Sequence, residues 1–431
     1  MYGKDNKFST RIGGAIGKDW HKDDSPLGSI NKSQNSIDLL IFSYREQMID
    51  TMSKMVAIKA ISPKSGGMGE SKRAKFLASI LEGWGFEPKI YEYTDDTGTK
   101  RPNVITKLGN ASRTIWFVPH IDTVSEGERG LWNSDPFAAK VEDGKIYGRG
   151  TNDDGQGVIS SMYALKALKD SGAKLKYNFG LALVSDEELG SFYGMQKLMK
   201  EGIFSNDDMF MIPDYWSKDG DIIEVGEKGV LWVKVTVTGA QVHASTPDKG
   251  SNAFRYMAKF VDAADKLLHV KYSKKDSLFR PESSTFEMTK HEKNVDSINI
   301  IPGKEIFYID CRVLPSYNLD DITSDLKSLA ASPEFRPVKI DVETFYREDP
   351  APVTDSNSEL VKLLEFSIKS LRNIVPKTSG IGGGTEAAFV RKANMQAVAW
   401  GTNLDVAHRP NEYVEINNMV EDAKVFAHML I

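Results

Sequence analysis

Several short apolar runs of this sequence end in a histidine or a carboxylate, the side chains that bind divalent metal ions and move protons. In an open α/β sheet the carboxyl ends of the strands form one edge, so residues directly after buried strands come together there. The residues concerned are His120 and Asp122 after 114–119, Glu187 and Glu188 after 179–186, Asp214 after 209–213, and His408 in the loop after 395–401.

Two adjacent aspartates, Asp153 and Asp154, follow a glycine-rich turn and precede an apolar helical stretch from Val158. Either carboxylate could cap that helix, because aspartate is favourable at a helix N-terminus. His120 alone could be a hydrogen-bonded core histidine, and the acidic turn SDEELG a solvated loop. The coincidence at strand ends instead favours a shared site, in which a cation relieves the repulsion between the carboxylates.

A set of histidines and carboxylates without cysteine is typical of catalytic zinc, with Mn²⁺ or Co²⁺ as alternatives. Asp122, two residues after His120, can accept the second ring N–H and fix the tautomer of a histidine ligand. Of the adjacent glutamates, one can bind metal while the other acts as a base. These residues predict a catalytic metal site.

The spacing of apolar residues changes along the chain and indicates which helices and strands position these residues. The runs named above are continuously apolar, as are strands covered on both faces in an α/β sheet. Helical spacing marks 36–55, 70–84 and Val158 to Asp170. We therefore expect one α/β catalytic domain built from two separated pieces of chain, 36–228 and 347–431.

Residues 229–346 show a different pattern. The stretch VLWVKVTVTG (230–239) alternates strictly, with Leu231 on the valine face and Trp232 on the other, which is typical of a strand with one covered face. A helix over 252–269, strands near 283–290 and 304–313, a helix near 319–331 and a strand at 337–345 complete a ferredoxin-like β-α-β-β-α-β order. Residues 1–35 are predicted to be a polar N-terminal arm.

Composition limits the partners. The 431 residues predict about two or three structural units. The net charge of −5 and the absence of a basic block argue against nucleic acid and membranes as partners. The single cysteine, Cys311, fits a reducing compartment, and no apolar run is long enough to span a bilayer. We expect a cytoplasmic protein.

The motifs resemble those of the co-catalytic zinc peptidase family of aminoacylase, acetylornithine deacetylase, succinyl-diaminopimelate desuccinylase, bacterial dipeptidases and glutamate carboxypeptidase. The resemblance runs from about Ile37 to the end in the family's order. It implies a zinc-peptidase-like catalytic domain with a central mixed sheet and helices on both faces, and an inserted lid that forms a homodimer. The motifs are PHIDTV, GRGTNDD, SDEELGS, PD, GAQVHASTPDKGSNAF, NIIPG, DCRVLP, GGGTEAAF and AHRPNEYV.

The resemblance implies a pair of divalent metal ions, zinc before Mn²⁺ or Co²⁺. Asp153 would bridge the two ions through its two oxygens. His120 and Asp214 would complete one ion, and Glu188 and His408 the other. The resemblance also implies a cis peptide bond after Asp153.

The resemblance assigns further roles. Asp122 would orient His120, and Glu187 would be the general base that takes a proton from the attacking water and passes it to the leaving nitrogen. His243 would reach across a dimer to the oxyanion of the tetrahedral intermediate. The residues that would contact the substrate are Asn299, Arg312, Gly383, Gly384 and Thr385.

The sequence departs from the family at Gly155-Gln156, where relatives commonly have Lys-Gly, and its branch markers are mixed. Asp214 is similar to the dipeptidase and aminoacylase branches, whereas GGGTEAAF looks like glutamate carboxypeptidase or the desuccinylase. We expect hydrolysis of an amide or peptide bond in a small carboxylate-bearing substrate, such as a dipeptide or an N-acyl amino acid. The alternatives are a biosynthetic deacylase of the desuccinylase or acetylornithine deacetylase type, and a metal-dependent binding protein without catalysis.

Overall fold

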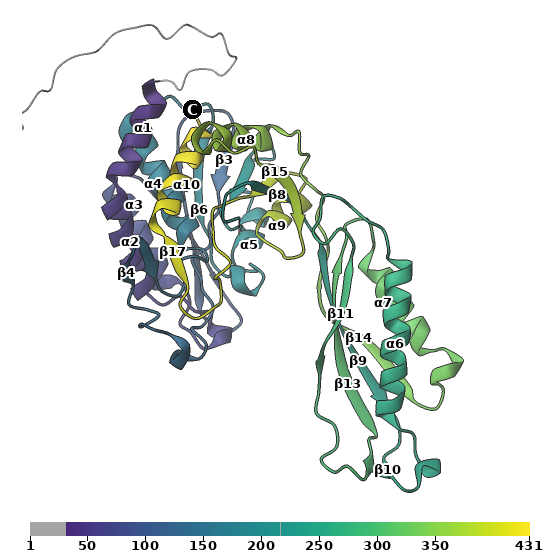
Figure 1. Ribbon diagram of the computed structural model, residues 1–431. Coiled ribbons are helices and arrows are strands. Elements are labelled where there is room, and N and C mark those ends of the chain that lie inside the picture. The colour runs from purple at the N-terminus through teal and green to yellow at the C-terminus, as the bar shows by residue number, and fades with distance from the viewer. Residues whose placement is uncertain (1–31, 216) are drawn as a thin grey trace, which may run out of the picture.

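The computed structural model describes residues 32–215 and 217–431. It has two lobes, one built on a large sheet between helices and the other on a smaller sheet with helices on one side (Figure 1). The predicted N-terminal arm lies outside the described residues except for 32–35. Those residues are the first of helix α1 (Lys32–Ser43), so helical structure begins earlier than the predicted residue 36.

The larger lobe contains an eight-stranded mixed sheet. Its central strands β6, β3, β7 and β16 run parallel, whereas β1 pairs antiparallel with β2 and β2 with β6. This confirms the predicted central mixed sheet. In spatial order the strands are β1 (Lys89–Thr94), β2 (Lys100–Leu108), β6 (Asn178–Leu183), β3 (Thr114–Phe117), β7 (Met209–Ile212), β16 (Gln396–Ala399), β8 (Ile222–Glu227) and β15 (Lys377–Ile381).

Helices cover both faces of this sheet. Because successive side chains of a strand point to opposite faces, Ile115 and Phe117 pack in one core while Trp116 and Val118 pack in the other. This is why the strand runs are continuously apolar. The first face is covered by α1, α2 (Arg45–Ala57), α3 (Ser71–Gly83), α4 (Gly155–Ser171), α8 (Glu359–Arg372) and α10 (Ile416–His428), and the second by α5 (Met195–Lys200) and α9 (Ala387–Lys392).

Short elements complete the larger lobe. A three-stranded sheet joins β17 (Tyr413–Glu415), β5 (Lys145–Tyr147) and β4 (Lys140–Glu142), so the end of the chain lies beside the loop that carries Asp153. Among the residues that the structure describes, the 3-10 helices are η1 (Pro63–Ser65), η2 (Arg129–Leu131), η3 (Glu187–Leu189), η4 (Pro247–Lys249) and η5 (Pro333–Phe335). No helix in the described part of the chain is both long and apolar enough to cross a membrane.

The smaller lobe has the predicted ferredoxin-like order. Its antiparallel sheet has the strand order β11-β13-β9-β14, and helices α6 and α7 cover one face. Leu231 of β9 is fully buried against these helices, and Trp232 faces the other way and is 36% exposed. The exact domain limits stay a prediction. The elements are β9 (Gly229–Thr238), β10 (Val242–His243), α6 (Ala253–Lys271), β11 (Thr285–His291), β12 (Ile300–Ile301), β13 (Lys304–Val313), α7 (Leu319–Ala330) and β14 (Lys339–Glu348).

Candidate active site

The predicted metal ligands come together at the carboxyl ends of the parallel strands. His120 follows β3, Glu188 lies in η3 after β6, and Asp214 follows β7. His408 lies in the loop between β16 and β17, and Asp153 stands just before α4. Three of the loops therefore follow neighbouring strands of one sheet, which is the arrangement that the sequence predicts.

Asp153 lies between two histidines. Its Oδ1 is 2.8 Å from His120 Nε2, and its Oδ2 is 3.1 Å from His408 Nε2. His408 Nε2 is also 3.1 Å from Glu188 Oε2, and His120 Nε2 is 3.9 Å from Asp214 Oδ2. Each oxygen of Asp153 thus faces a different group of side chains, as a bridging carboxylate would require; the bridging role stays a prediction.

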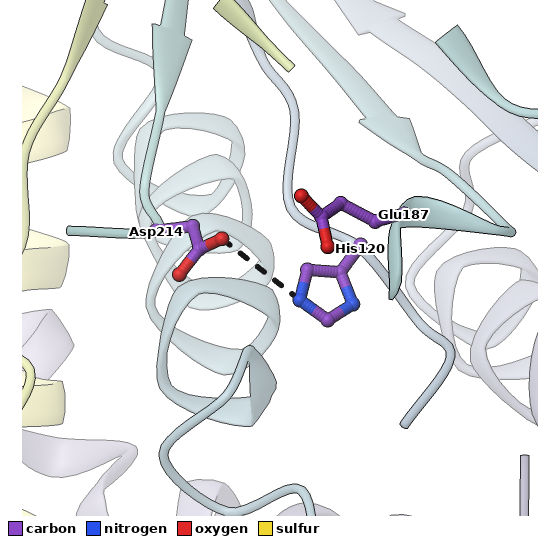
Figure 2. A group of neighbouring side chains, drawn as sticks. All are labelled: His120, Glu187 and Asp214. Atoms are coloured by element: carbon purple, nitrogen blue, oxygen red, sulfur yellow. Dashed lines mark ion pairs between the residues drawn. The ribbon is translucent and has the colours of Figure 1, made fainter. Parts of the chain in front are cut away.

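The neighbouring carboxylates form compact groups with His120. His120, Glu187 and Asp214 offer ligand atoms within 4.8 Å of one another (Figure 2), and so do His120, Asp153 and Glu188. The predicted general base, Glu187, therefore lies beside the predicted metal ligands rather than apart from them. A carboxylate in this position can accept a proton from a water molecule held at the same centre.

The electrostatics of the centre favour divalent cations. Burial, together with the charge of Asp153, raises the pKa of Asp214 to about 7, and burial raises the pKa of Glu187 well above its usual range. Hydrogen bonds with Asp153 and Glu188 raise the pKa of His408 to about 10. Although burial opposes its ionisation, the histidines lower the pKa of Asp153. The raised pKa values of Asp214 and Glu187 reflect burial and the repulsion between neighbouring carboxylates, which the charge of a bound cation would offset.

Asp122 holds the acidic turn as well as facing His120. Its two oxygens accept hydrogen bonds from the backbone N–H groups of Glu187 and Glu188, both at 3.1 Å. Its Oδ1 lies 3.4 Å from His120 Nδ1, a nitrogen that forms no hydrogen bond among the described residues. Asp122 therefore ties the two loops together, a contact that the sequence analysis missed because no local spacing indicates it.

The adjacent aspartates have different contacts. The peptide bond between Asp153 and Asp154 is cis, as the resemblance implies. Asp154 accepts hydrogen bonds from Gly157 N at 3.1 Å and from His120 N at 3.2 Å. It therefore caps α4 and supports the backbone of His120, while Asp153 alone faces the histidines. The helix-cap alternative is confirmed for Asp154, and the metal-binding role stays a prediction for Asp153.

A cavity of about 500 Å³ lies over the centre and includes predicted substrate contacts. Arg312 of β13 lines it together with Asp153, Glu187, Asp214 and His408, and so do Gly384 and Thr385. The Arg312 guanidinium donates to Asp310 Oδ1 at 2.7 Å, to Asp310 Oδ2 at 3.1 Å and to Gly382 O at 3.0 Å. Gly383 lines an adjoining cavity of about 310 Å³ with Asp214.

Two predicted residues lie outside this cavity. His243 is exposed and its Nδ1 is 2.7 Å from Ser245 Oγ, whereas the exposed Asn299 accepts a backbone hydrogen bond from Ala244 at 2.8 Å. Both lie at the paired strands β10 and β12, at the end of the smaller lobe far from the large sheet (Figure 1). Neither residue lines the cavity of its own chain, and their roles stay a prediction.

Buried ion pairs that support the loops of the candidate metal site were not predicted from the sequence. Arg101 is almost fully buried and lies 3.0 Å from Asp186, the residue before Glu187, and 2.6 Å from Glu70. Glu412 pairs with Arg149 beside the turn that presents Asp153. The motifs SDEELGS and AHRPNEYV contain Asp186 and Glu412, but their partners are distant in sequence. Only those partners show what the two acids hold.

The fold and the clustered ligands define a metal-dependent hydrolase. The model of peptidase family M20/M25/M40 matches residues 116–431, and the chain belongs to this family. The predicted family and enzyme class are confirmed.

Known proteins are similar over nearly the whole chain. An uncharacterised metallohydrolase of Methanocaldococcus jannaschii is 36% identical over 406 residues, which cover 89% of this chain and 99% of that protein. A succinyl-diaminopimelate desuccinylase of Sulfurovum sp. is 26% identical over 384 residues, covering 88% and 97%. The crystal structure of human carnosine dipeptidase 1 superposes with a TM-score of 0.70 at 19% identity, covering 93% and 98%, and shares the fold.

Proposed function

We propose that the protein hydrolyses the amide or peptide bond of a small substrate with a free carboxylate, such as a dipeptide or an N-acyl amino acid. One observation carries the proposal. Arg312 lines the same cavity as Glu187 and the candidate metal ligands, so a group that can bind a carboxylate shares one cavity with a group that can transfer protons. The planar guanidinium binds both oxygens of a carboxylate.

In this proposal His120, Asp153, Asp214, Glu188 and His408 hold two divalent ions, with zinc as the working metal. When bound, such ions polarise a scissile carbonyl and lower the pKa of the attacking water.

The remaining steps belong to Glu187 and Arg312. Because burial raises its pKa, Glu187 is a stronger base than an exposed glutamate and can take a proton from the attacking water. It then donates this proton to the leaving nitrogen. Arg312 binds the substrate carboxylate and so orients the scissile bond toward Glu187.

A deacylase of the desuccinylase type is the second candidate, supported by the relatives that are about a quarter identical. A succinylated amino acid carries more than one carboxylate. Among the described residues that line the cavity, Arg312 is the only lysine or arginine, and Glu348 adds a further carboxylate to the wall. Because a second substrate carboxylate would meet no second lysine or arginine among these lining residues, the lining supports substrates with one carboxylate.

Two further features belong to the proposal. We propose a homodimer that forms through the smaller lobe, because His243 lies too far from the cavity to contact a substrate in its own chain. Light scattering tests the dimer, and a fully active monomer would contradict it. We also propose that the protein works in the cytoplasm.

The test combines metal content with turnover on a substrate panel. The panel pairs dipeptides and N-acyl amino acids with N-succinyl amino acids, with and without added Zn²⁺, Mn²⁺ or Co²⁺. We expect the single-carboxylate substrates to be cleaved best and a chelator to abolish cleavage. If the chelated protein stays active, or no panel member is cleaved, the proposal is wrong.

Glu187→Gln tests the proton-transfer role. The variant should retain bound metal and lose about 10²–10⁴-fold in kcat, because only the transferable proton is lost. Glu128→Gln, at an exposed glutamate outside the cavity lining, should behave as wild type. Near-normal turnover by Glu187→Gln would assign the base to another group.

A further inference from the structure

The open face of the smaller sheet carries aromatic side chains where it borders the cavity. Trp232 of β9 and Tyr346 of β14 both line the cavity beside Glu187 and Glu188, and each is 36% exposed. Their ring centroids are 4.9 Å apart with an interplanar angle of 41°. An aromatic pair that lines a cavity and stays partly exposed offers apolar area that a bound group can cover.

A β-bulge brings Tyr346 to this face. Val342 of β14 packs among the residues under α6 and α7, and simple alternation would point Tyr346 toward the same helices. The pairing of β14 with β9 shifts between Thr344 and Tyr346, so that Phe345 is the extra residue and Tyr346 pairs with Trp232. Bulges next to functional sites commonly redirect a side chain in this way.

One carboxylate fixes the aromatic pair beside Arg312. Trp232 Nε1 donates to Asp310 Oδ2 at 2.8 Å, and Arg312 Nε donates to Asp310 Oδ1 at 2.7 Å. The polar atom of the indole is therefore satisfied, and its ring faces the cavity as an apolar surface. The side chain and the carboxylate of an amino acid branch from one Cα, so their binding sites must be neighbours, as Trp232 and Arg312 are.

Resting on the proposed function, we propose that Trp232 and Tyr346 form the binding site for the substrate side chain next to the carboxylate that Arg312 binds. This site selects substrates with a bulky apolar residue on the carboxyl side, aromatic residues above all. Stacked and edge-to-face rings add to the stabilisation from buried apolar area. Leu189, Val230 and Phe389 extend the apolar wall of the same cavity.

The test uses substrates that share one acyl part and end in Gly, Ala, Leu or Phe. We expect kcat/KM to rise along this series by at least about 100-fold. Trp232→Ala and Tyr346→Ala should each lower kcat/KM for the Phe substrate by about 10- to 100-fold and change the Gly substrate by less than about threefold. Phe345→Ala is the matched control, because Phe345 belongs to the same bulge, is 61% exposed and does not line the cavity.

The Gly substrate separates side-chain recognition from indirect effects. If Trp232 acted only by holding Asp310 and Arg312, Trp232→Ala would weaken the Gly and Phe substrates equally, and the inference would be wrong. Trp232→Phe keeps an apolar ring without the indole N–H and should retain most of the preference for Phe. The inference would also be wrong if Trp232→Ala and Tyr346→Ala kept the same preference for the Phe substrate over the Gly substrate.

Binding provides a readout that does not depend on turnover. In the Glu187→Gln background, calorimetry should show tighter binding of the Phe substrate than of the Gly substrate, and Trp232→Ala should reduce that difference. If the Glu187→Gln variant that retains Trp232 binds the Phe and Gly substrates with equal affinity, the inference is wrong. The two proposals fail differently: if no panel member is cleaved, the proposed function is wrong, whereas cleavage without side-chain preference overturns this inference alone.

Discussion

The Glu412 carboxylate accepts a hydrogen bond from the backbone N–H of Asp153 at 3.1 Å, across 259 residues of sequence. The same carboxylate accepts from Asn152 N at 2.9 Å and from Gly150 N at 3.1 Å, and it pairs with Arg149. All these groups are buried. One buried charge near the end of the chain therefore holds the turn that presents Asp153 to both histidines.

Replacing Glu412 should loosen that turn. We expect Glu412→Ala to lower the free energy of unfolding by about 3–5 kcal/mol, because Arg149 is left as an uncompensated buried charge. Metal affinity should fall as well, because the Asp153 backbone loses its acceptor. Thermal melts and metal titration calorimetry measure the two effects. Asp405→Asn, at an exposed acid in the same loop region, is the control, and an unchanged metal affinity in Glu412→Ala would contradict the prediction.

Arg312 should contribute to binding only when the substrate carries a carboxylate. Arg312→Ala should lower kcat/KM by about 100-fold for carboxylate substrates, since a charge-assisted bidentate contact is lost. Arg312→Lys keeps the positive charge but loses the paired N–H donors of the guanidinium, so its kcat/KM should lie between those of wild type and Arg312→Ala. C-terminal amides of the same substrates are the control: they should be poor for wild type and variant alike. A comparable loss on the amides would indicate that Arg312 acts through the fold.

Metal binding should stabilise the folded protein in a pH-dependent way. Zinc at about 1,000 times its Kd should add about 4 kcal/mol to the free energy of unfolding, and chelation should remove it. Because the raised pKa of His408, about 10, means that protons compete for the ligand, metal affinity should increase from pH 6 to pH 8. Differential scanning fluorimetry at several pH values measures both effects. If neither zinc nor a chelator changes the Tm, the proposed metal centre is wrong.

Asp422 should make stability fall as the pH rises through the weakly acidic range. It accepts from Gln156 Nε2 at 2.7 Å and Thr402 N at 3.1 Å, and burial raises its pKa from 3.8 to about 6. Between these values the unfolded chain is ionised while the folded carboxyl keeps its proton, so increasing pH favours unfolding by up to about 3 kcal/mol. Above the folded pKa no further loss occurs.

Asp422→Asn removes this titration. Its stability relative to wild type should therefore improve between pH 4.5 and pH 7, as measured by denaturant unfolding. Glu421→Gln, at the adjacent and more exposed acid, should show no such change. An Asp422→Asn variant whose difference from wild type is the same at both pH values would refute the assigned pKa. Gln156, at the position where the sequence departs from the family, contributes one of these hydrogen bonds.

Much of the fold follows from local patterns in the chain. Continuous apolar runs predicted β3, β6, β7 and β16, and strict alternation predicted β9 with Leu231 inside and Trp232 outside. Local patterns predicted no helix at α8 or α10 and no strand at β1 or β2. β1 is a sheet edge whose residues stay largely accessible, so its apolar period is weak. Such elements are specified by their neighbours more than by their own residues.

The sequence by itself determined that His120, Glu188 and Asp214 meet at the site, because each follows a buried strand and parallel strands end at a common edge. Only the tertiary structure decided that Asp153 faces the histidines while Asp154 caps α4, that Asp122 holds the acidic turn, and that a bulge brings Tyr346 into the cavity. The physical reason is range. Periodicity and capping act over a few residues, whereas these orientations depend on strand register and on hydrogen bonds between segments far apart in the chain.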